Sequence, residues 1–274
     1  MNLRSAAMAA LLAAAFCAGH AMAGTLSLDG TFRQGGLVTG RTDPGTQITL
    51  DGTPVRVGPA GRFVFGFGRD AAPKAVLTAV FPDGTRQART LEVAQRTYRI
   101  QRIDGLPRRM VTPSEKQLKR IRAEAKKINA ARGGFTMAPY FEQGFIWPVK
   151  GRISGVYGSQ RILNGEPRRP HLGIDIAAPT GTPVVAAAGG TVTLAEKDLY
   201  FTGGTIVIDH GFGLSTVYSH LSAVSVKTGQ GVKQGELIGK IGSTGRSTGA
   251  HLDWRINWFQ ERLDPAFLVG PKPE

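Results

Sequence analysis

Five residues in the C-terminal half of the chain are of the types that bind metal ions or transfer protons. His171 and Asp175 lie four positions apart, His251 and Asp253 lie two apart, and His220 falls between the two pairs. Four of the five histidines of the chain lie between positions 171 and 251. Histidines gathered in one stretch favour a metal or acid–base site over a scatter of core histidines.

The spacing within each pair decides whether both side chains reach one point. Residues i and i+4 on a straight strand lie roughly 13 Å apart, so His171 and Asp175 require a bend. Gly173 between them supplies the conformational freedom and disfavours a helix. His251 and Asp253 on a strand would point to the same face. The two pairs can then face each other, with His220 as a fifth group.

Two interpretations of these residues stay open on spacing alone. A hydrolytic metal site uses three protein ligands and a water, whose pKa the ion lowers. Neighbouring histidines then take the proton or stabilise the oxyanion. The alternative is a set of histidines in β-turns, each hydrogen-bonded to the backbone.

The charge and the N-terminus narrow the choice of partner. A formal charge of +14 and a pI near 10.4 favour an anionic partner. Residues 1–23 read as a signal peptide, with Arg4, an apolar stretch too short to span a membrane, and Ala21-Met22-Ala23 before the expected cut. Cleavage would remove Cys17, the one cysteine. Export to the periplasm or cell envelope argues against nucleic acid and for the cell wall.

Residues 24–103 are predicted to form a small β-sandwich, immunoglobulin-like in type. Short runs rich in β-branched and aromatic residues alternate with turn signals such as Asp51-Gly52. The expected strands are 46–50, 55–57, 62–67, 75–81 and 89–93. We expect this module to serve packing or targeting.

Residues 104–140 are predicted to be a linker that contains one basic helix, 112–132. Thr112 would be the N-cap, Pro113 would take the first position, Glu115 would complete a capping box, and Gly133 would follow the end. The basic face is interpreted as a solvated surface, with contact to an anionic wall as the alternative.

Residues 141–270 are predicted to be an antiparallel β domain, because short apolar runs alternate with glycines there. The expected strands are 151–158, 183–192, 205–209, 214–218, 236–241 and 251–257. The fold class is therefore mainly β: a sandwich, a linker helix and a C-terminal antiparallel sheet that carries the histidines.

The region from about 145 to 265 resembles the lysostaphin-type, or LytM-type, zinc metallopeptidases, which cut peptide cross-bridges in peptidoglycan. The order and spacing of several short motifs agree with that family. These motifs are His171-x-Gly-x-Asp175, Gly181-Thr182-Pro183-Val184, Asp209-His210-Gly211, Tyr218-Ser219-His220-Leu221-Ser222, Gly229-Gln230-Gly231-Val232 and 242–249.

The resemblance implies a role for each residue of the site. His171 and Asp175 match the first two zinc ligands, and His220 and His251 match the catalytic histidines. The third ligand of the family is the second histidine of a His-x-His motif, and Asp253 occupies that position here. Carboxylate is a legitimate zinc ligand, but two carboxylates would neutralise the ion and weaken it as a Lewis acid.

The resemblance implies one zinc ion and cleavage of peptidoglycan cross-links. The competing hypothesis is a degenerate member that regulates another cell-wall hydrolase or binds the wall. His210, Arg255 and Arg161 are further candidates, His210 as a structural or supporting histidine and the arginines as groups that orient substrate carboxylates. The oligomeric state stays open.

Overall fold

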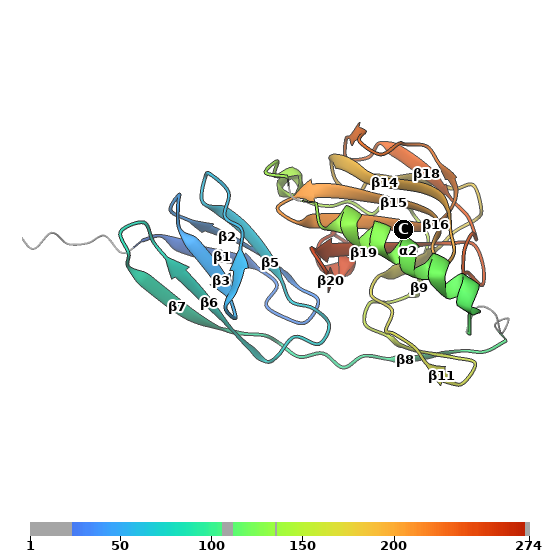
Figure 1. Cartoon of the computed structure of the whole chain (residues 1–274), viewed down its shortest axis with the longest axis horizontal. Helices are drawn as coiled ribbons and strands as arrows, with labels where there is room; N and C mark the ends of the chain where they lie inside the picture. Colours follow the sequence, from blue (N-terminus) through green and yellow to red (C-terminus); the bar gives the residue numbers. More distant parts are fainter. Residues whose placement is uncertain (1–23, 106–111, 135, 272–274) are drawn as a thin grey trace, which may run out of the picture.

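The protein is described here by a computed structural model that covers residues 24–105, 112–134 and 136–271. The expected signal peptide, 1–23, lies outside the described residues. Two β lobes follow one another, and a helix lies along the C-terminal lobe (Figure 1). No helix within the described ranges is both long enough and apolar enough to cross a membrane.

The N-terminal lobe consists of two sheets that share one core, in which Phe63, Phe65 and Leu77 are fully buried. The first sheet has the order β1 (Leu26–Gly30), β2 (Leu37–Thr42), β5 (Arg62–Gly66), and the second has the order β4 (Thr53–Val55), β3 (Gln47–Leu50), β6 (Lys74–Val80), β7 (Arg86–Glu92). The predicted turn at Asp51-Gly52 joins β3 to β4, and both of its residues have positive φ, as a tight hairpin requires. β1 and β2 were not predicted, and the immunoglobulin-like assignment stays a prediction.

Helix α2 (Glu115–Arg132) begins later than predicted. Its N-cap is Ser114, not Thr112. The capping box is formed by Ser114 and Gln117, and not by the predicted pair of Thr112 and Glu115. Both pairs have the spacing of a capping box, so the sequence pattern alone does not distinguish them. The predicted end at Gly133 is confirmed.

The helix packs on the C-terminal lobe, where Ile128 and Ala131 contact a small cluster that includes Val207 and Val217. Two of its basic residues are ion-paired with the lobe: Arg120 with Asp198 and Lys127 with Glu196. Part of the basic face is therefore used in docking the helix.

The C-terminal lobe is a ten-stranded antiparallel sheet with the main order β17-β14-β15-β16-β19-β12-β9. Its elements are η1 (Tyr140–Gln143), β9 (Arg152–Gly155), β12 (Ile174–Ala177), β13 (Pro183–Val185), β14 (Gly190–Leu199), β15 (Gly203–Gly211), β16 (Leu214–Val224), β17 (Gly231–Val232), β18 (Leu237–Ile241), β19 (His251–Trp258), β20 (Glu261–Leu263) and η2 (Pro265–Phe267). The predicted single strand 183–192 is wrong: buried alanines at 186–188 form a connection between β13 and β14.

A linker strand joins the lobes and becomes part of the second one. β8 (Ile100–Ile103) pairs in parallel with β10 (Gln160–Leu163), and β11 (Glu166–Pro167) completes this small sheet. The lobes also touch directly: Arg96 Nη1 lies 2.8 Å from Asp264 Oδ2, and the Asp264 backbone N–H donates to the Gly35 carbonyl.

Candidate metal centre and active site

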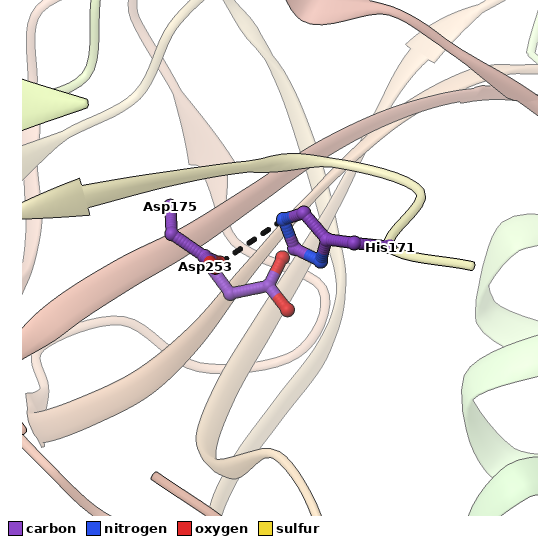
Figure 2. Close-up of side chains that lie close together, drawn as sticks. All are labelled: His171, Asp175 and Asp253. Atoms are coloured by element: carbon purple, nitrogen blue, oxygen red, sulfur yellow. Dashed lines mark ion pairs between the residues drawn. The ribbon is translucent and has the colours of Figure 1, made fainter. Parts of the chain in front are cut away.

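His171, Asp175 and Asp253 form one buried cluster. Each offers a ligand atom, and these three atoms lie within 4.8 Å of one another. Figure 2 shows the three side chains converging, with His171 entering from the loop that precedes β12. Asp175 on β12 pairs directly with Asp253 on β19 in the antiparallel register. The structure thus brings together the three residues predicted as metal ligands.

The bend between His171 and Asp175 is present, but Gly173 is needed for space more than for backbone freedom. Gly173 is not among the residues with positive φ. A Cβ atom there would lie 2.6 Å from the Arg255 Cγ and 3.0 Å from the Asp253 Oδ1. A side chain at this position would therefore displace a predicted ligand and the arginine beside it.

Three buried polar atoms of the cluster lack a hydrogen-bond partner: both imidazole nitrogens of His171 and the Oδ1 of Asp175. The His171 Nε2 lies 3.1 Å from this Oδ1 but outside hydrogen-bond geometry. Unpartnered buried polar atoms are costly in a native fold. A cation held in the cluster would satisfy one His171 nitrogen and the Asp175 Oδ1, so the donor set fits a metal ion.

Asp175 is enclosed by β9 and by an arginine. A Cβ atom at Gly155, its partner on β9, would lie only 2.2 Å from the Asp175 Oδ2. Arg161 Nη2 lies 2.5 Å from the same oxygen. Burial opposes ionisation, but His171 and Arg161 outweigh it and keep the pKa of Asp175 below its usual value.

Asp253 is held by a second arginine. Arg255 Nε and Nη2 donate to its two oxygens at 2.8 and 2.5 Å, a bidentate pair. Burial opposes ionisation, but the charge and hydrogen bonds of Arg255 hold the Asp253 pKa far below its usual range. Arg161 and Arg255 already compensate both negative charges, so the two carboxylates would neutralise a bound ion less than residue type alone predicts.

His220 and His251 lie beside the cluster with their ring centroids 4.7 Å apart. The Nδ1 of His220 lies 2.8 Å from the Thr244 carbonyl, and that of His251 lies 2.8 Å from the Gly249 carbonyl. Because a carbonyl only accepts, each Nδ1 carries the proton and each neutral ring leaves Nε2 as an acceptor. The His251 Nε2 lies 3.8 Å from the Asp175 Oδ1.

The backbone conformation and the burial of His220 hold its side chain in one position. Its φ of 66° is in the left-handed region, which is uncommon for a residue other than glycine. Its backbone N–H donates to the Thr202 carbonyl. Burial lowers its pKa, although the carboxylates of Asp253 and Asp175 act in the opposite sense. The net shift favours the neutral, proton-accepting form of His220.

His210 has a structural environment. It is fully buried, and its two ring nitrogens lie 2.7 Å from the Gly189 carbonyl and 2.7 Å from the Thr216 hydroxyl. Burial lowers its pKa to about 4. Neither contact involves the cluster, in line with the structural role that the sequence favoured.

Sequence reasoning missed the residues that orient the site. Thr244 and Gly249 lie in the glycine-rich segment 242–249, which was noted as a motif but given no task. Gln101 on β8 accepts a hydrogen bond from Arg161 Nε at 3.2 Å. No local sequence signal marks Gln101, since the parallel pairing of β8 with β10 joins residues about sixty positions apart.

Comparison with known proteins agrees with this geometry. Residues 169–265 match the model of Peptidase family M23. The DD-carboxypeptidase/endopeptidase Mpg of Neisseria meningitidis is 38% identical over 151 residues, which are 55% of this chain and 33% of that protein. The peptidoglycan DD-endopeptidase ShyA of Vibrio cholerae is 42% identical over 113 residues, 40% of this chain and 26% of that protein. The chain thus matches about a third or less of these curated relatives.

A solved structure extends the likeness beyond the peptidase region. An M23 protein from Pseudomonas aeruginosa is 28% identical, with a TM-score of 0.67 over 86% of this chain and 94% of that one. The fold and the site together define a peptidase-type β domain. The C-terminal lobe is a domain of Peptidase family M23.

Proposed function

We propose that this protein is a zinc-dependent endopeptidase that cleaves peptide cross-links in peptidoglycan. The observation that carries the proposal is the convergence of three potential ligand atoms within 4.8 Å, with two further histidines beside them. A buried group of this composition at the meeting of two strands and a loop is typical of a hydrolytic metal site.

His171, Asp175 and Asp253 would hold one zinc ion. Imidazole and carboxylate are both ordinary zinc ligands. The unpartnered His171 and Asp175 Oδ1 support this choice, because a cation would satisfy that oxygen and one of the two imidazole nitrogens. The Arg255 pair occupies one lone pair of each Asp253 oxygen, and a carboxylate oxygen keeps a second one.

Zinc at this position would lower the pKa of a bound water and polarise the scissile carbonyl. His220 and His251 would act as the general base and the oxyanion stabiliser. The carbonyls of Thr244 and Gly249 fix the tautomer of both rings, so either Nε2 can accept a proton from the water. The histidine that stabilises the oxyanion would do so with a proton on its Nε2. Burial lowers the pKa of His220, which favours its role as a proton acceptor.

The substrate and location follow from three features together. The relatives carry names of DD-endopeptidases, and one of those names specifies peptidoglycan. The N-terminal sequence favours export to the periplasm or envelope. A formal charge of +14 suits an anionic polymer such as the cell wall. We assign residues 24–103 to a β module, 104–140 to the linker and 141–270 to the peptidase domain, although β8 at the end of the first range pairs with β10 of the peptidase domain.

One observation favours a second candidate, a metal-free regulator or wall-binding protein on the same fold. Asp253 stands where the resembling family has a histidine, and Arg255 already satisfies both of its oxygens. An aspartate so paired has no electrostatic need for a metal. The unpartnered atoms of His171 and the retention of both histidines favour the enzyme.

Metal content separates these candidates. The purified protein should contain about one zinc per chain after dialysis against the metal, and His171→Ala should contain none. His210→Gln is the matched control, because His210 is equally buried but bonded elsewhere. A wild-type protein that takes up no zinc would support the regulator.

A further inference from the structure

Arg255 is positively charged, yet it lies directly beside the proposed zinc site, where a second positive charge would bind. Its guanidinium binds both oxygens of Asp253, the predicted third ligand. The Arg255 side chain is 27% exposed and that of Asp253 only 4%. Its stem passes over Gly173, where a Cβ atom would lie 2.6 Å from the Arg255 Cγ. The pair is thus built into the walls of the site.

The charges of the metal-free cluster cancel. Asp175 and Asp253 pair directly across neighbouring strands, an arrangement that is repulsive for two like charges. Arg161 and Arg255 each bind one of the two carboxylates, and His171 would be a neutral donor once a metal is bound. The two carboxylates and the two guanidinium groups therefore balance before any ion enters. Addition of a divalent ion leaves an excess of two positive charges.

We propose that Arg255 is a built-in counter-cation of the metal centre that lowers its affinity for zinc while it keeps Asp253 in place when the metal is absent. This proposal rests on the zinc function proposed above. Without metal, Arg255 neutralises a carboxylate that would otherwise be buried and unpaired. With zinc bound, the Asp253 carboxylate would serve both Arg255 and the ion, and the guanidinium would draw electron density from that carboxylate. The ion would then keep more of its Lewis acidity than two free carboxylates would leave it.

The expected size of the effect follows from electrostatics. At a typical separation of about 6 Å, repulsion between a single charge and a divalent ion amounts to about a tenfold change in affinity even in a water-like dielectric. The real medium beside a buried carboxylate is less polar. Removal of the Arg255 charge should therefore tighten zinc binding at least tenfold, provided that Asp253 stays in place.

The test is a zinc titration of three proteins by isothermal calorimetry, paired with thermal unfolding with and without zinc. Arg255→Met removes the charge but keeps an unbranched stem over Gly173. Arg96→Met is the matched control, because Arg96 forms a similar ion pair with Asp264 in which the side chains are 21% and 5% exposed. Both variants lose an ion pair, but only one pair belongs to the metal centre.

We expect Arg255→Met to bind zinc at least ten times more tightly than the wild type. Without zinc it should melt at a lower temperature, and added zinc should raise its melting temperature by more than that of the wild type. Arg96→Met should melt lower but bind zinc as the wild type does. Equal or weaker zinc binding by a folded Arg255→Met would overturn the counter-cation role and leave the zinc function intact. Binding by Arg255→Met alone would support the role and refute a zinc-loaded wild type. Absence of binding in all three proteins would refute both.

Discussion

Arg255 donates two hydrogen bonds to Asp253, the residue two positions before it on the same strand. Alternate residues of a strand share a face, so the pair needs no change of backbone direction. Asp253 in turn lies opposite Asp175 on β12. This relationship links the strand register to the charge balance of the candidate metal centre.

The losses of stability caused by removing Asp253 and by removing Arg255 should not be additive. Asp253→Ala leaves Arg255 without its carboxylate, and Arg255→Met leaves a buried carboxylate without its cation. Each single substitution should cost about 3 kcal/mol of unfolding free energy in metal-free protein. The double variant should cost clearly less than the sum. Urea unfolding of the four proteins measures this coupling, and strictly additive losses would contradict it.

Gly155→Ala should damage the metal centre from the neighbouring strand. The new Cβ atom would lie 2.2 Å from the Asp175 Oδ2, so Asp175 must move. We expect a stability loss of about 1–3 kcal/mol, as for other overpacked sites, and at least a tenfold loss of zinc affinity. Gly231→Ala is the control, because a Cβ atom there meets no other atom within 4 Å. Unchanged zinc binding in Gly155→Ala would contradict the placement of Asp175.

The pKa of His210 predicts a loss of stability in mild acid. Its folded-state pKa is about 4, below the unfolded value of about 6.5. The unfolded chain therefore binds the proton first, so the contribution is complete above pH 6.5 and is lost as the pH falls to 4. The loss amounts to about 3 kcal/mol. Urea midpoints of wild type and His210→Gln between pH 7 and 4 should converge on acidification, and parallel curves would contradict this.

Asp264 should determine whether the two lobes unfold together. It binds Arg96 through its carboxylate, its backbone N–H donates to Gly35, and its side chain caps η2. We expect one calorimetric transition in the wild type. Asp264→Ala should separate it into two, whereas Asp264→Asn, which keeps the cap, should do so less. Two resolved transitions in the wild type would show that the lobes are not coupled.

Much of the fold was predictable because local patterns and tertiary structure agree. The turn at Asp51-Gly52, the end of α2 at Gly133 and the antiparallel strands around the site all follow from residue type and spacing. The N-cap was misplaced because Thr112 and Ser114 both satisfy the capping pattern. The predicted strand 183–192 is two strands, because the alanines at 186–188 are buried in the core but lie in the connection between them.

The site was predictable as a set of residues but not as a balance of charges. The five residues at 171, 175, 220, 251 and 253 meet as expected. Arg255 lies two positions after Asp253 in the sequence, so the two side chains are expected on the same face of the strand. The strand pattern does not show whether such an arginine forms an ion pair with its neighbour or points to solvent. The contact of Arg161 with Gln101 depends on a parallel strand pairing between distant segments, which sequence spacing does not encode.

Digestion of isolated peptidoglycan tests the central proposal most directly. Wild-type protein with zinc should release un-cross-linked peptides, detected by chromatography and mass spectrometry, and His220→Ala should release none although it binds the metal. Asp253→His should also be active, because it supplies the histidine of the resembling family. If the wild type releases nothing while Asp253→His does, the protein is not a peptidase in its natural form and the regulator is the better account.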